Sequence, residues 1–374
     1  MQVNDNVRMK HFGNFIALLI LAINALFTGL LLLVAYSPYI QPVAHPVQSC
    51  FGLTFPIFAL INGAFLIFWL VIQRYKTALL PLIGFLLCYS QLRTYLPLNF
   101  HTANPPEESI KFLSYNIMGF NGAGKKDGKN PILTYLKESN ADILCLQEYA
   151  SDESPRRLTQ KDIERELKDY PYHRISVVGS GSGYTNKIAC YSKFPILSAR
   201  VLNYPSGYNG SVLYELKLNE DTITLINNHL ESNKLTKADK DIYEDILKAP
   251  EKEKVKSGAR LLVHKLAEAS AIRAPQADTI AREISSSRYP SVIVCGDFND
   301  TPISYAHRVI AKNLDDAFTQ SGRGLGISYN QNKFYFRIDN ILISKNLQSY
   351  NCTVDRSIKE SDHYPIWCYI AKRQ

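Results

Sequence analysis

The chain has 374 residues, of which 46% are hydrophobic and 20% are charged, and its formal net charge is +8. This length exceeds that of one small domain, so more than one structural unit is expected. Residues 1–96 carry five basic side chains against one acidic side chain, which leaves the larger remainder of the chain with a net charge of only +4. A net charge of only +4 on this larger part argues against a dedicated nucleic-acid-binding domain, because such domains usually present a concentrated basic face.

Three apolar runs lie near the N-terminus, and we place candidate membrane spans near residues 12–36, 51–72 and 78–96. The first contains no charged residue and is long enough to cross a bilayer as a helix. The third is shorter and is interrupted by Pro81 and Gly84. A signal peptide explains one such run but not three in succession, so we expect about three transmembrane helices. A buried helical hairpin of a soluble protein is the alternative.

The charges of the loops predict how this segment is oriented. Arg8 and Lys10 precede the first span, and Arg74 and Lys76 follow the second, whereas the loop over 37–50 has neither lysine nor arginine. Because positively charged loops stay in the cytoplasm, we expect the N-terminus inside and the first loop outside. Three crossings then place the rest of the chain outside the cytoplasm, and two crossings would leave it inside.

Residues 97–109, which include Pro105-Pro106, are expected to link the membrane segment over 1–96 to a soluble domain over 110–374. In that domain, short apolar runs and helical patterns are interspersed, which predicts an α/β fold. Strands are expected at 110–115, 141–146, 187–191, 212–218, 222–227, 292–295, 335–343 and 366–370. Helices are expected at 131–139, 163–167, 256–270 and 277–285.

Polar residues stand at or just beyond the ends of several of these strands. They are Asn116, Glu148, His229, Asp297 with Asn299, and Asp362 with His363, while Asp339 lies inside its strand. Strand ends of one sheet layer meet on a common rim, so we expect these side chains to come together. Each has an ordinary alternative, such as a hydrogen-bonded core histidine for His229 or a surface pair of Asp339 with Arg337. Their occurrence in one series is much harder to explain by chance.

The motifs around these residues read L-S-Y-N, L-Q-E, N-H-L-E-S, G-D-F-N, R-I-D-N-I-L and S-D-H-Y-P. Together they resemble the endonuclease/exonuclease/phosphatase superfamily, from about residue 110 to the C-terminus. The resemblance implies a four-layer α/β sandwich, in which two mixed β-sheets pack together and helices flank them. It also implies hydrolysis of a phosphate ester with a divalent cation, Mg2+ or alternatively Mn2+.

By the same resemblance, Glu148 and Asp362 would hold the metal as hard oxygen ligands, and Asn116 would support the metal or a phosphate oxygen. Many nucleases of the family carry an acidic residue two positions after this asparagine, where Met118 stands in this chain. A thioether is a poor magnesium ligand, so we expect a simpler metal site centred on Glu148.

The catalytic roles that the resemblance implies fall on five residues. Asp297 would orient or deprotonate the attacking water, Asn299 would hold the phosphate, and His229 would hydrogen-bond a phosphoryl oxygen. His363, oriented by Asp339, would stabilise the transition state or assist the leaving group.

We therefore expect a membrane-anchored phosphoesterase whose substrate is a nucleic acid, a lipid head group or a soluble ester. The alternatives are an endonuclease or exonuclease, a sphingomyelinase-like lipid phosphodiesterase, and a non-catalytic membrane receptor that retains the fold. The presence of Glu148, Asp297 and His363 speaks against the receptor. Beyond the substrate and the lipid bilayer, no partner is inferred.

Two further features carry weaker expectations. The charged stretch over 233–256 is expected to be a solvated helix and loop, with a substrate-facing or membrane-facing insert as the alternative. The seven cysteines show no C-x-x-C spacing, so most are expected in the core. Cys352 and Cys368 could pair in an oxidising compartment.

Overall fold

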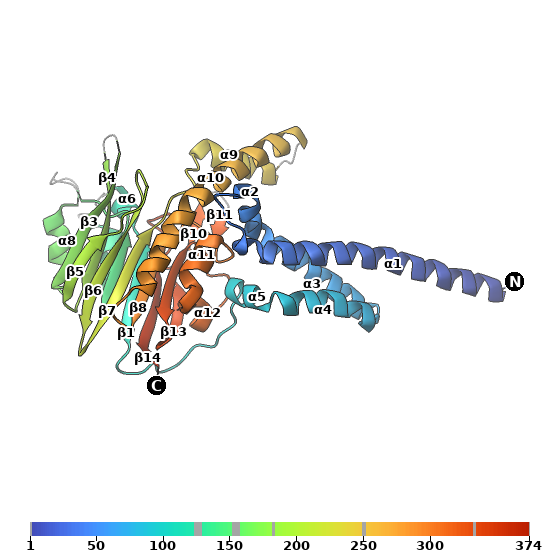
Figure 1. Ribbon diagram of the computed structural model, residues 1–374, viewed down its shortest axis with the longest axis horizontal. Helices are drawn as coiled ribbons and strands as arrows, with labels where there is room; N and C mark the ends of the chain where they lie inside the picture. The colour runs from blue at the N-terminus through green and yellow to red at the C-terminus, as the bar shows by residue number, and fades with distance from the viewer. Residues whose placement is uncertain are drawn as a thin grey trace.

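The computed structural model describes residues 2–122, 129–151, 158–181, 184–248, 252–331 and 334–373. Within these ranges, a bundle of N-terminal helices projects from an α/β body, and the first helix extends farthest from it (Figure 1). The charged stretch expected over 233–256 lies partly outside the described residues, at 249–251.

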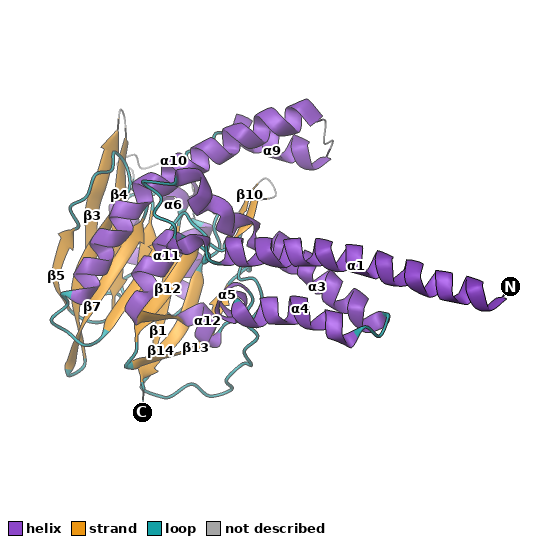
Figure 2. Ribbon diagram, turned by 45° about the vertical axis from the view of Figure 1, so that its right-hand side comes forward, coloured by secondary structure: helices purple, strands orange, loops and turns teal. Residues whose placement is uncertain are grey.

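Two six-stranded sheets form the body (Figure 2). The first has the strand order β13 (Leu347–Val354), β14 (Ile366–Lys372), β1 (Ile110–Asn116), β2 (Ile143–Gln147), β4 (Tyr184–Ser192), β3 (Tyr172–Gly181). The second has the order β5 (Ile196–Val201), β6 (Gly210–Leu218), β7 (Asp221–His229), β8 (Val292–Asp297), β12 (Asp339–Ser344), β9 (Leu314–Asp316). Each sheet is mixed, because β1 pairs with β2 and β7 pairs with β8 in parallel, while their other neighbours run antiparallel.

The two sheets pack face to face on an apolar core. Phe112 and Ile143 from the first sheet meet Ile293 and Ile341 from the second, and all four are buried. Burial of each such side chain stabilises the fold by roughly 1.5–3 kcal/mol. The outer faces are covered by helices: α7 (Pro131–Glu138) and α8 (Gln160–Glu166) on the first sheet, α10 (Lys252–Ser285) and α11 (Tyr305–Ile310) on the second. The predicted sandwich of two mixed sheets flanked by helices is confirmed.

Two expected elements differ from the structure. The helices expected at 256–270 and 277–285 are one helix, α10, which continues through Pro275. A proline removes one backbone hydrogen bond, but packing of the helix on the second sheet beyond that point keeps it in place. The strand expected at 335–343 is divided, because β11 (Phe334–Phe336) leaves the sheet and pairs with β10 (Tyr329–Gln331), whereas β12 stays in it.

The strands that the sequence does not predict are β13, β3, β5 and β9, the edges of the two six-stranded sheets, and β10 of the two-stranded sheet. An edge strand is paired on one side only and often carries polar side chains. In β5, for example, every residue after Ile196 is exposed. The apolar run that identifies an interior strand is therefore missing from it.

The N-terminal bundle consists of α1 (Gln2–Ala35), α3 (Phe55–Val71), α4 (Tyr75–Leu87) and α5 (Tyr89–Tyr95). Two described stretches, Phe12–Tyr39 and Pro46–Val71, are long and apolar enough to cross a membrane. The third run, expected over 78–96, is not one long helix. The 13-residue α4 ends at Cys88, whose φ of −109° and ψ of 24° depart from helical values before α5 begins.

Polar side chains inside the bundle bond to one another. Thr28 of α1 donates to Oδ1 of Asn62 in α3 at 2.8 Å, and the indole N–H of Trp69 donates to Oδ1 of Asn24 at 3.0 Å. Hydrogen bonds between helices of this kind are common in membrane proteins, where no water satisfies such groups. They fix how α1 and α3 lie against each other.

The loop between α1 and α3 lies on the α/β body. It contains η1 (Ser37–Tyr39), α2 (Pro46–Ser49) and η2 (Cys50–Thr54). Nε of Arg308 in α11 donates to the carbonyl oxygen of Pro38 at 2.8 Å, and the hydroxyls of Ser49 and Ser270 lie 3.2 Å apart. This loop and the α/β body are therefore at the same end of the helical bundle.

All seven cysteines are free thiols, six of them buried and Cys50 half-buried. Cys352 and Cys368 are neighbours on β13 and β14, but they do not form the disulfide considered above. Burial among apolar side chains accounts for most of the cysteines, as small core residues.

Candidate active site

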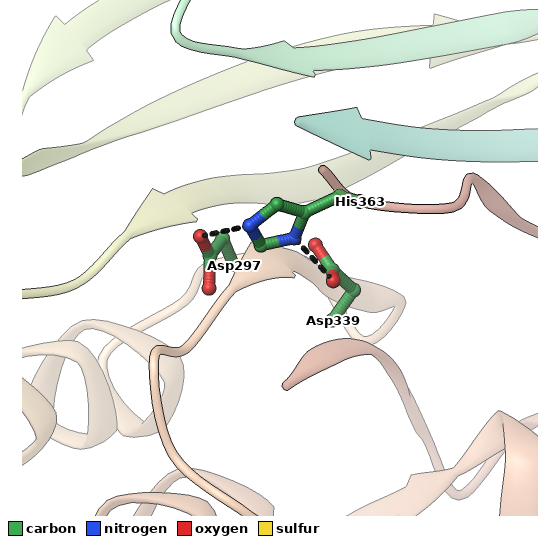
Figure 3. A group of neighbouring side chains, drawn as sticks. All are labelled: Asp297, Asp339 and His363. Atoms are coloured by element: carbon green, nitrogen blue, oxygen red, sulfur yellow. Dashed lines mark hydrogen bonds and ion pairs between the residues drawn. The ribbon is translucent and has the colours of Figure 1, made fainter. Parts of the chain in front are cut away.

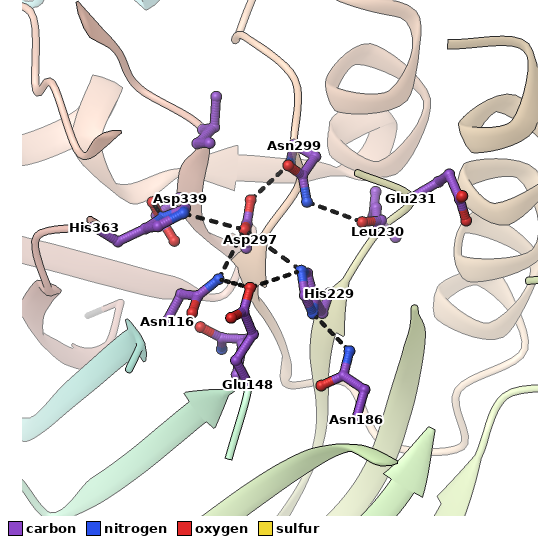
Figure 4. A network of polar contacts seen from close by, with 12 residues as sticks. Asn116, Glu148, Asn186, His229, Leu230, Glu231, Asp297, Asn299, Asp339 and His363 are labelled. Carbon is purple, nitrogen blue, oxygen red and sulfur yellow. Dashed lines mark hydrogen bonds and ion pairs between the residues drawn. The ribbon is translucent and has the colours of Figure 1, made fainter. Parts of the chain in front are cut away.

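The polar residues predicted from the strand ends meet on one rim of the sandwich (Figure 4). The parallel register of β7 and β8 aligns His229 with Asp297, and the antiparallel register of β8 and β12 aligns Asp297 with Asp339. In the other sheet, β1 and β2 align Asn116 with the residue before Glu148. Each pairing fixes a side chain through the backbone ladder, so the rim is rigid.

His363 lies between two carboxylates (Figure 3). Its Nδ1 is 2.8 Å from Oδ2 of Asp339, and its Nε2 is 3.6 Å from Oδ2 of Asp297. Burial by itself lowers the pKa of this imidazole, but the charges of Asp339 and Asp297 outweigh burial and raise the pKa to about 10. The ring is thus an imidazolium at neutral pH, and Asp339 fixes its orientation.

Asp297 is buried and takes hydrogen bonds on both oxygens. Oδ1 accepts from the backbone N–H of Asn299 at 2.8 Å, and Oδ2 accepts from Nδ2 of Asn116 at 3.1 Å. Burial raises the pKa of this carboxyl to about 6, although the charge of His363 opposes the rise. Asp297 is therefore ionised at neutral pH yet basic enough to accept a proton.

His229 is held from behind by a residue that the sequence does not reveal. Nδ2 of Asn186 lies 3.1 Å from Nδ1 of His229 and also donates to the carbonyl oxygen of Tyr208 at 3.0 Å. Nδ1 then accepts, so the proton is on Nε2, which points toward Glu148 at 3.6 Å. Burial lowers the pKa of His229, which keeps the ring neutral. No motif marks Asn186, because it lies in the middle of β4.

Asn116 and Glu148 form a pair at the mouth of the site. Nδ2 of Asn116 donates to Oε1 of Glu148 at 3.0 Å, while its Oδ1 accepts from the backbone N–H of Met118 at 3.2 Å. The amide oxygen is thus already engaged, and the amide nitrogen orients two carboxylates, those of Glu148 and Asp297. Glu148 itself has a φ of 51°, an uncommon value for a residue with a side chain.

The site holds more negative than positive charge. Four carboxylates, those of Glu148, Asp297, Asp339 and Asp362, surround one imidazolium. Burial raises the pKa of Glu148, and the charge of Asp362 adds to the rise. Of the described acidic and histidine side chains, Asp297, Asp339 and His363 lie close enough to hold a cation together. The ring of His363 already lies between those two aspartates.

Asn299 connects the loops that follow β7 and β8. Its Nδ2 donates to the carbonyl oxygen of Leu230 at 3.0 Å, and its φ of 51° is left-handed. Gly296, two residues before Phe298, has a φ of 121°, and a Cβ there would lie 2.0 Å from the carbonyl oxygen of Asn228. Only glycine fits such a close backbone approach, which accounts for the G-D-F-N motif.

Arg337 is not the surface partner of Asp339. It is buried, its guanidinium lies 3.6 Å from Asp316, and it stacks 4.6 Å above the ring of Phe318. It also donates to the carbonyl oxygen of Thr94 in α5. Arg337 therefore connects the α/β body to the N-terminal bundle, while Asp339 faces the site.

A polar layer below the rim joins the two sheets. Gln147 of β2 donates from Nε2 to Oδ1 of Asn227 in β7 at 2.6 Å, and to the hydroxyl of Ser114 at 3.2 Å. These buried amides set the distance between the ends of the two sheets. Gln147 of L-Q-E and Asn227, two residues before His229, are both polar residues near strand ends in the sequence, but their contact depends on how the two sheets pack.

The site opens into a cavity of about 650 Å³. Glu148, His229, Asp297, Asn299 and His363 line one end of it, together with the half-buried Asp362. Phe51 and Leu53 of η2 also line this cavity.

Comparisons with family models give a match for each part of the chain. The model of the Endonuclease/Exonuclease/phosphatase family matches residues 113–363. A domain of unknown function (DUF8431) matches residues 17–95. A comparison with curated proteins found no match.

Solved structures share the fold at low sequence identity. The human Nocturnin catalytic domain with bound sulfate is 15% identical, with a TM-score of 0.50, over 74% of this chain and 97% of that one. An endonuclease/exonuclease/phosphatase from Beutenbergia cavernae is 12% identical, with a TM-score of 0.50, over 71% and 72%. TDP2 from D. rerio, complexed with a single-strand DNA product, is 17% identical, with a TM-score of 0.48, over 71% and 99%.

Proposed function

Because the chain belongs to the Endonuclease/Exonuclease/phosphatase family, we propose that it hydrolyses a phosphate ester with the help of a divalent cation. The observation that carries this proposal is the grouping of Asp297, the imidazolium of His363 and the neutral His229 on one rim. Asp297 is a proton acceptor, and His363 and His229 are two N–H donors that face the same cavity. Attack of water on a phosphorus atom requires such an acceptor for the proton of water and such donors for the phosphoryl oxygens.

In the proposed reaction, Asp297 accepts a proton from water as the water oxygen bonds to phosphorus. The ester P–O bond breaks, and the alcohol oxygen leaves with the bonding electrons and takes up a proton from solvent. The Nε2–H groups of His363 and His229 donate to phosphoryl oxygens and stabilise the negative charge that gathers there. Asp339 keeps His363 charged and oriented, and Asn116 holds Asp297 in place. Asn299 lies at the phosphate end of the cavity, where its side chain limits how the ester is seated.

We propose that Glu148 and Asp362 hold the cation, magnesium or manganese. Both carboxylates line the cavity, and the excess of negative charge described above supports the assignment. When bound, the cation would supply charge neutralisation at the phosphoryl group. Asn116 would act on the metal indirectly, by orienting Glu148.

The test is hydrolysis of bis(4-nitrophenyl) phosphate and 4-nitrophenyl phosphate by the full chain, with magnesium and with excess EDTA. We expect nitrophenol release that depends on the metal and is lost in Asp297→Asn. The comparison of the two esters tells a diesterase from a monoesterase. Equal activity of Asp297→Asn and the original protein would refute the proposed chemistry.

We further propose that the N-terminal bundle anchors the enzyme in a bilayer. In the most apolar 18-residue segment of each long stretch, only 22% (Phe12–Tyr39) and 17% (Pro46–Val71) of the residues are buried in the structure. Most of the apolar surface of these helices therefore has no protein cover. A helix from the core of a soluble protein would be mostly buried. Lipid is the medium that suits such a surface.

The orientation that we propose places the α/β body outside the cytoplasm. The loop over 37–54 contacts this body, so both must lie on the same side of the membrane. At the far end of the bundle, Arg74 donates to Oδ1 of Asn14 at 2.9 Å, so the positive turn after α3 lies beside the N-terminal half of α1. The positive-inside tendency then favours that end as cytoplasmic.

A further inference from the structure

The cavity beside the site is built by two parts of the chain that are far apart in sequence. Its volume of about 650 Å³ lies in the range of cavities that hold small organic ligands. The catalytic groups line this cavity, and so do residues of η2, the short helix that directly precedes α3. The membrane-proximal segment is therefore part of the wall of the active site.

The walls away from the catalytic end are mainly apolar. Leu262, Val263 and Leu266 of α10 face the cavity from one side, and Phe334 and Phe336 of β11 line it from another. A phosphate group needs only the polar end. The remaining volume suits a hydrocarbon group, because burying apolar surface against such walls is favourable.

The wall formed by η2 is held firmly against the catalytic loops. A Cβ at Gly52 would lie 2.0 Å from the carbonyl oxygen of Ile303, so the two backbones are in direct contact. Ile303 in turn packs with Leu31 of α1 and Phe55 of α3. The apolar surface thus runs without interruption from the helices of the bundle to the loop that follows Asp297.

The charges on the cavity wall do not suit a polynucleotide. Of the basic side chains that line it in the described part of the chain, Lys234 is 2.7 Å from Glu231 and Arg273 is 3.2 Å from Asp300. Lys240 donates to the hydroxyl of Tyr329 at 2.6 Å. Binding to a nucleic-acid backbone depends on basic side chains that neutralise successive phosphates, and this wall leaves few of them unpaired.

We infer that the substrate is a phosphate ester of an alcohol that carries a hydrocarbon chain, with the chain lying between η2, α10 and β11 and the phosphate at Asp297 and His363. This inference rests on the proposed phosphoesterase activity and names its substrate class. Such an ester is itself a membrane component, and η2 stands where the helices of the bundle meet the catalytic body.

The test compares esters that differ only in their chain. Full-length protein in amphipol is assayed with methyl, dodecyl and dioctanoylglyceryl 4-nitrophenyl phosphate, and kcat/KM is measured for each. Each buried methylene is worth about fourfold in binding, so we expect the chain-bearing esters to exceed the methyl ester by at least about tenfold. The dodecyl and dioctanoylglyceryl esters distinguish a single-chain alcohol from a glycerol-based one.

Two neighbouring residues of α10 give a matched pair of variants. Val263 lines the cavity and Leu261 does not, although their side chains are similarly exposed, at 39% and 41%. We expect Val263→Asn to lower kcat/KM for the chain-bearing esters by about tenfold relative to the methyl ester, whereas Leu261→Asn should leave the ratio between these esters as in the original protein. Melting temperatures of both variants show that the fold is retained.

The outcomes separate this inference from the proposed function. Hydrolysis of the methyl ester without any gain from a chain, or faster cleavage of a single-stranded oligonucleotide, would overturn the inference and leave the phosphoesterase intact. Hydrolysis of none of these diesters, and of neither nitrophenyl ester in the first test, would refute the phosphoesterase. In that case, the binding of dodecyl phosphate still decides whether the cavity takes a chain. Binding is measured as the rise in melting temperature of the original protein and of Val263→Asn. Equal stabilisation of the original protein by dodecyl and methyl phosphate would end the inference.

Discussion

His363 shows how two neighbours set the chemistry of one side chain. It lies in a loop, yet it is buried, and its Nδ1 contacts Asp339 at 2.8 Å while Nε2 faces Asp297. A histidine held in this way keeps its charge and presents one N–H in a fixed direction. The ligand atoms of Asp297, Asp339 and His363 lie within 4.8 Å of one another, a spacing that is also typical of a metal-binding cluster.

Loss of the imidazole should lower turnover more than substrate binding. We expect His363→Ala to reduce kcat by about a hundredfold or more, because one positioned donor contributes on the order of 3 kcal/mol to the transition state. KM should change much less. His264→Ala, on an exposed part of α10, is the control and should behave as the original protein. Because His363 is buried, the melting temperature is measured with kcat; a destabilised variant of normal turnover would end the catalytic assignment.

Asp339→Asn should cause a smaller loss of the same kind. The imidazole stays in place, but it loses the carboxylate that orients it and keeps it charged. The double variant should lose less than the sum of the single losses, since both residues serve one group. Additive losses in kcat would show that Asp339 acts independently of His363.

Glu148 allows a separate test of the metal. Glu148→Gln should weaken magnesium binding at least about tenfold, because it removes a charged oxygen ligand while keeping the shape of the side chain. The magnesium dependence of hydrolysis and calorimetric binding of the metal both measure this. Glu166→Gln, in an exposed pair with Lys137, is the control. Full activity in excess EDTA would exclude a metal role for Glu148 altogether.

At the scale of elements, a buried charge cluster fastens the N-terminal bundle to the body. Asp316 caps α12 (Ala317–Ser321) by accepting from the backbone N–H of Phe318 at 2.8 Å, and His307 lies 3.3 Å from its carboxylate. Arg337 faces the same carboxylate and bonds to α5. Removing one member would leave its partner buried and uncompensated.

We expect Asp316→Asn to lower stability by roughly 3 kcal/mol at neutral pH, as breaking a buried ion pair does. Burial opposes ionisation, but Arg337 and His307 outweigh it and hold the pKa of Asp316 well below its usual range. A depressed pKa gives stability that is present above the ordinary value near 4 and is lost as the pH falls below it. As the pH falls below about 4, the stability of Asp316→Asn should therefore decrease less than that of the original protein.

Asp315→Asn is the matched control, since Asp315 is adjacent and pairs with Lys345 and Arg373 at the surface. Its effect should stay below about 1 kcal/mol, as for exposed ion pairs. Thermal unfolding at pH 7 and at pH 3.5 measures both variants. Equal losses of stability in Asp316→Asn and Asp315→Asn would show that the buried ion pair contributes no more to stability than an exposed one.

At the scale of the molecule, the proposed orientation predicts which side of the membrane each end occupies. A cysteine introduced at the exposed Ser357 should react with an impermeant maleimide in spheroplasts, and one introduced at Tyr75, the exposed first residue of α4, should not. The native thiols give little background, because six are buried and Cys50 is half-buried. The reverse labelling pattern would place the catalytic body in the cytoplasm.

The sequence by itself determined the interior strands, the series of polar strand ends and, with the exception of α11, the flanking helices. These depend on local information: an apolar run long enough to be buried, a glycine that a close backbone approach requires, and motifs such as G-D-F-N. The four edge strands escaped prediction, because half-exposed strands lack that apolar run.

The tertiary structure alone decided which polar groups meet. Three contacts join segments that are far apart in the chain. Asn186 contacts His229, η2 contacts Ile303, and Arg337 pairs with Asp316 and not with Asp339. No spacing in the sequence encodes them, because they depend on how two sheets and a helical bundle pack together. Packing also turned a membrane-proximal loop into a wall of the active-site cavity, since only the folded chain brings residues 51 and 297 to one space.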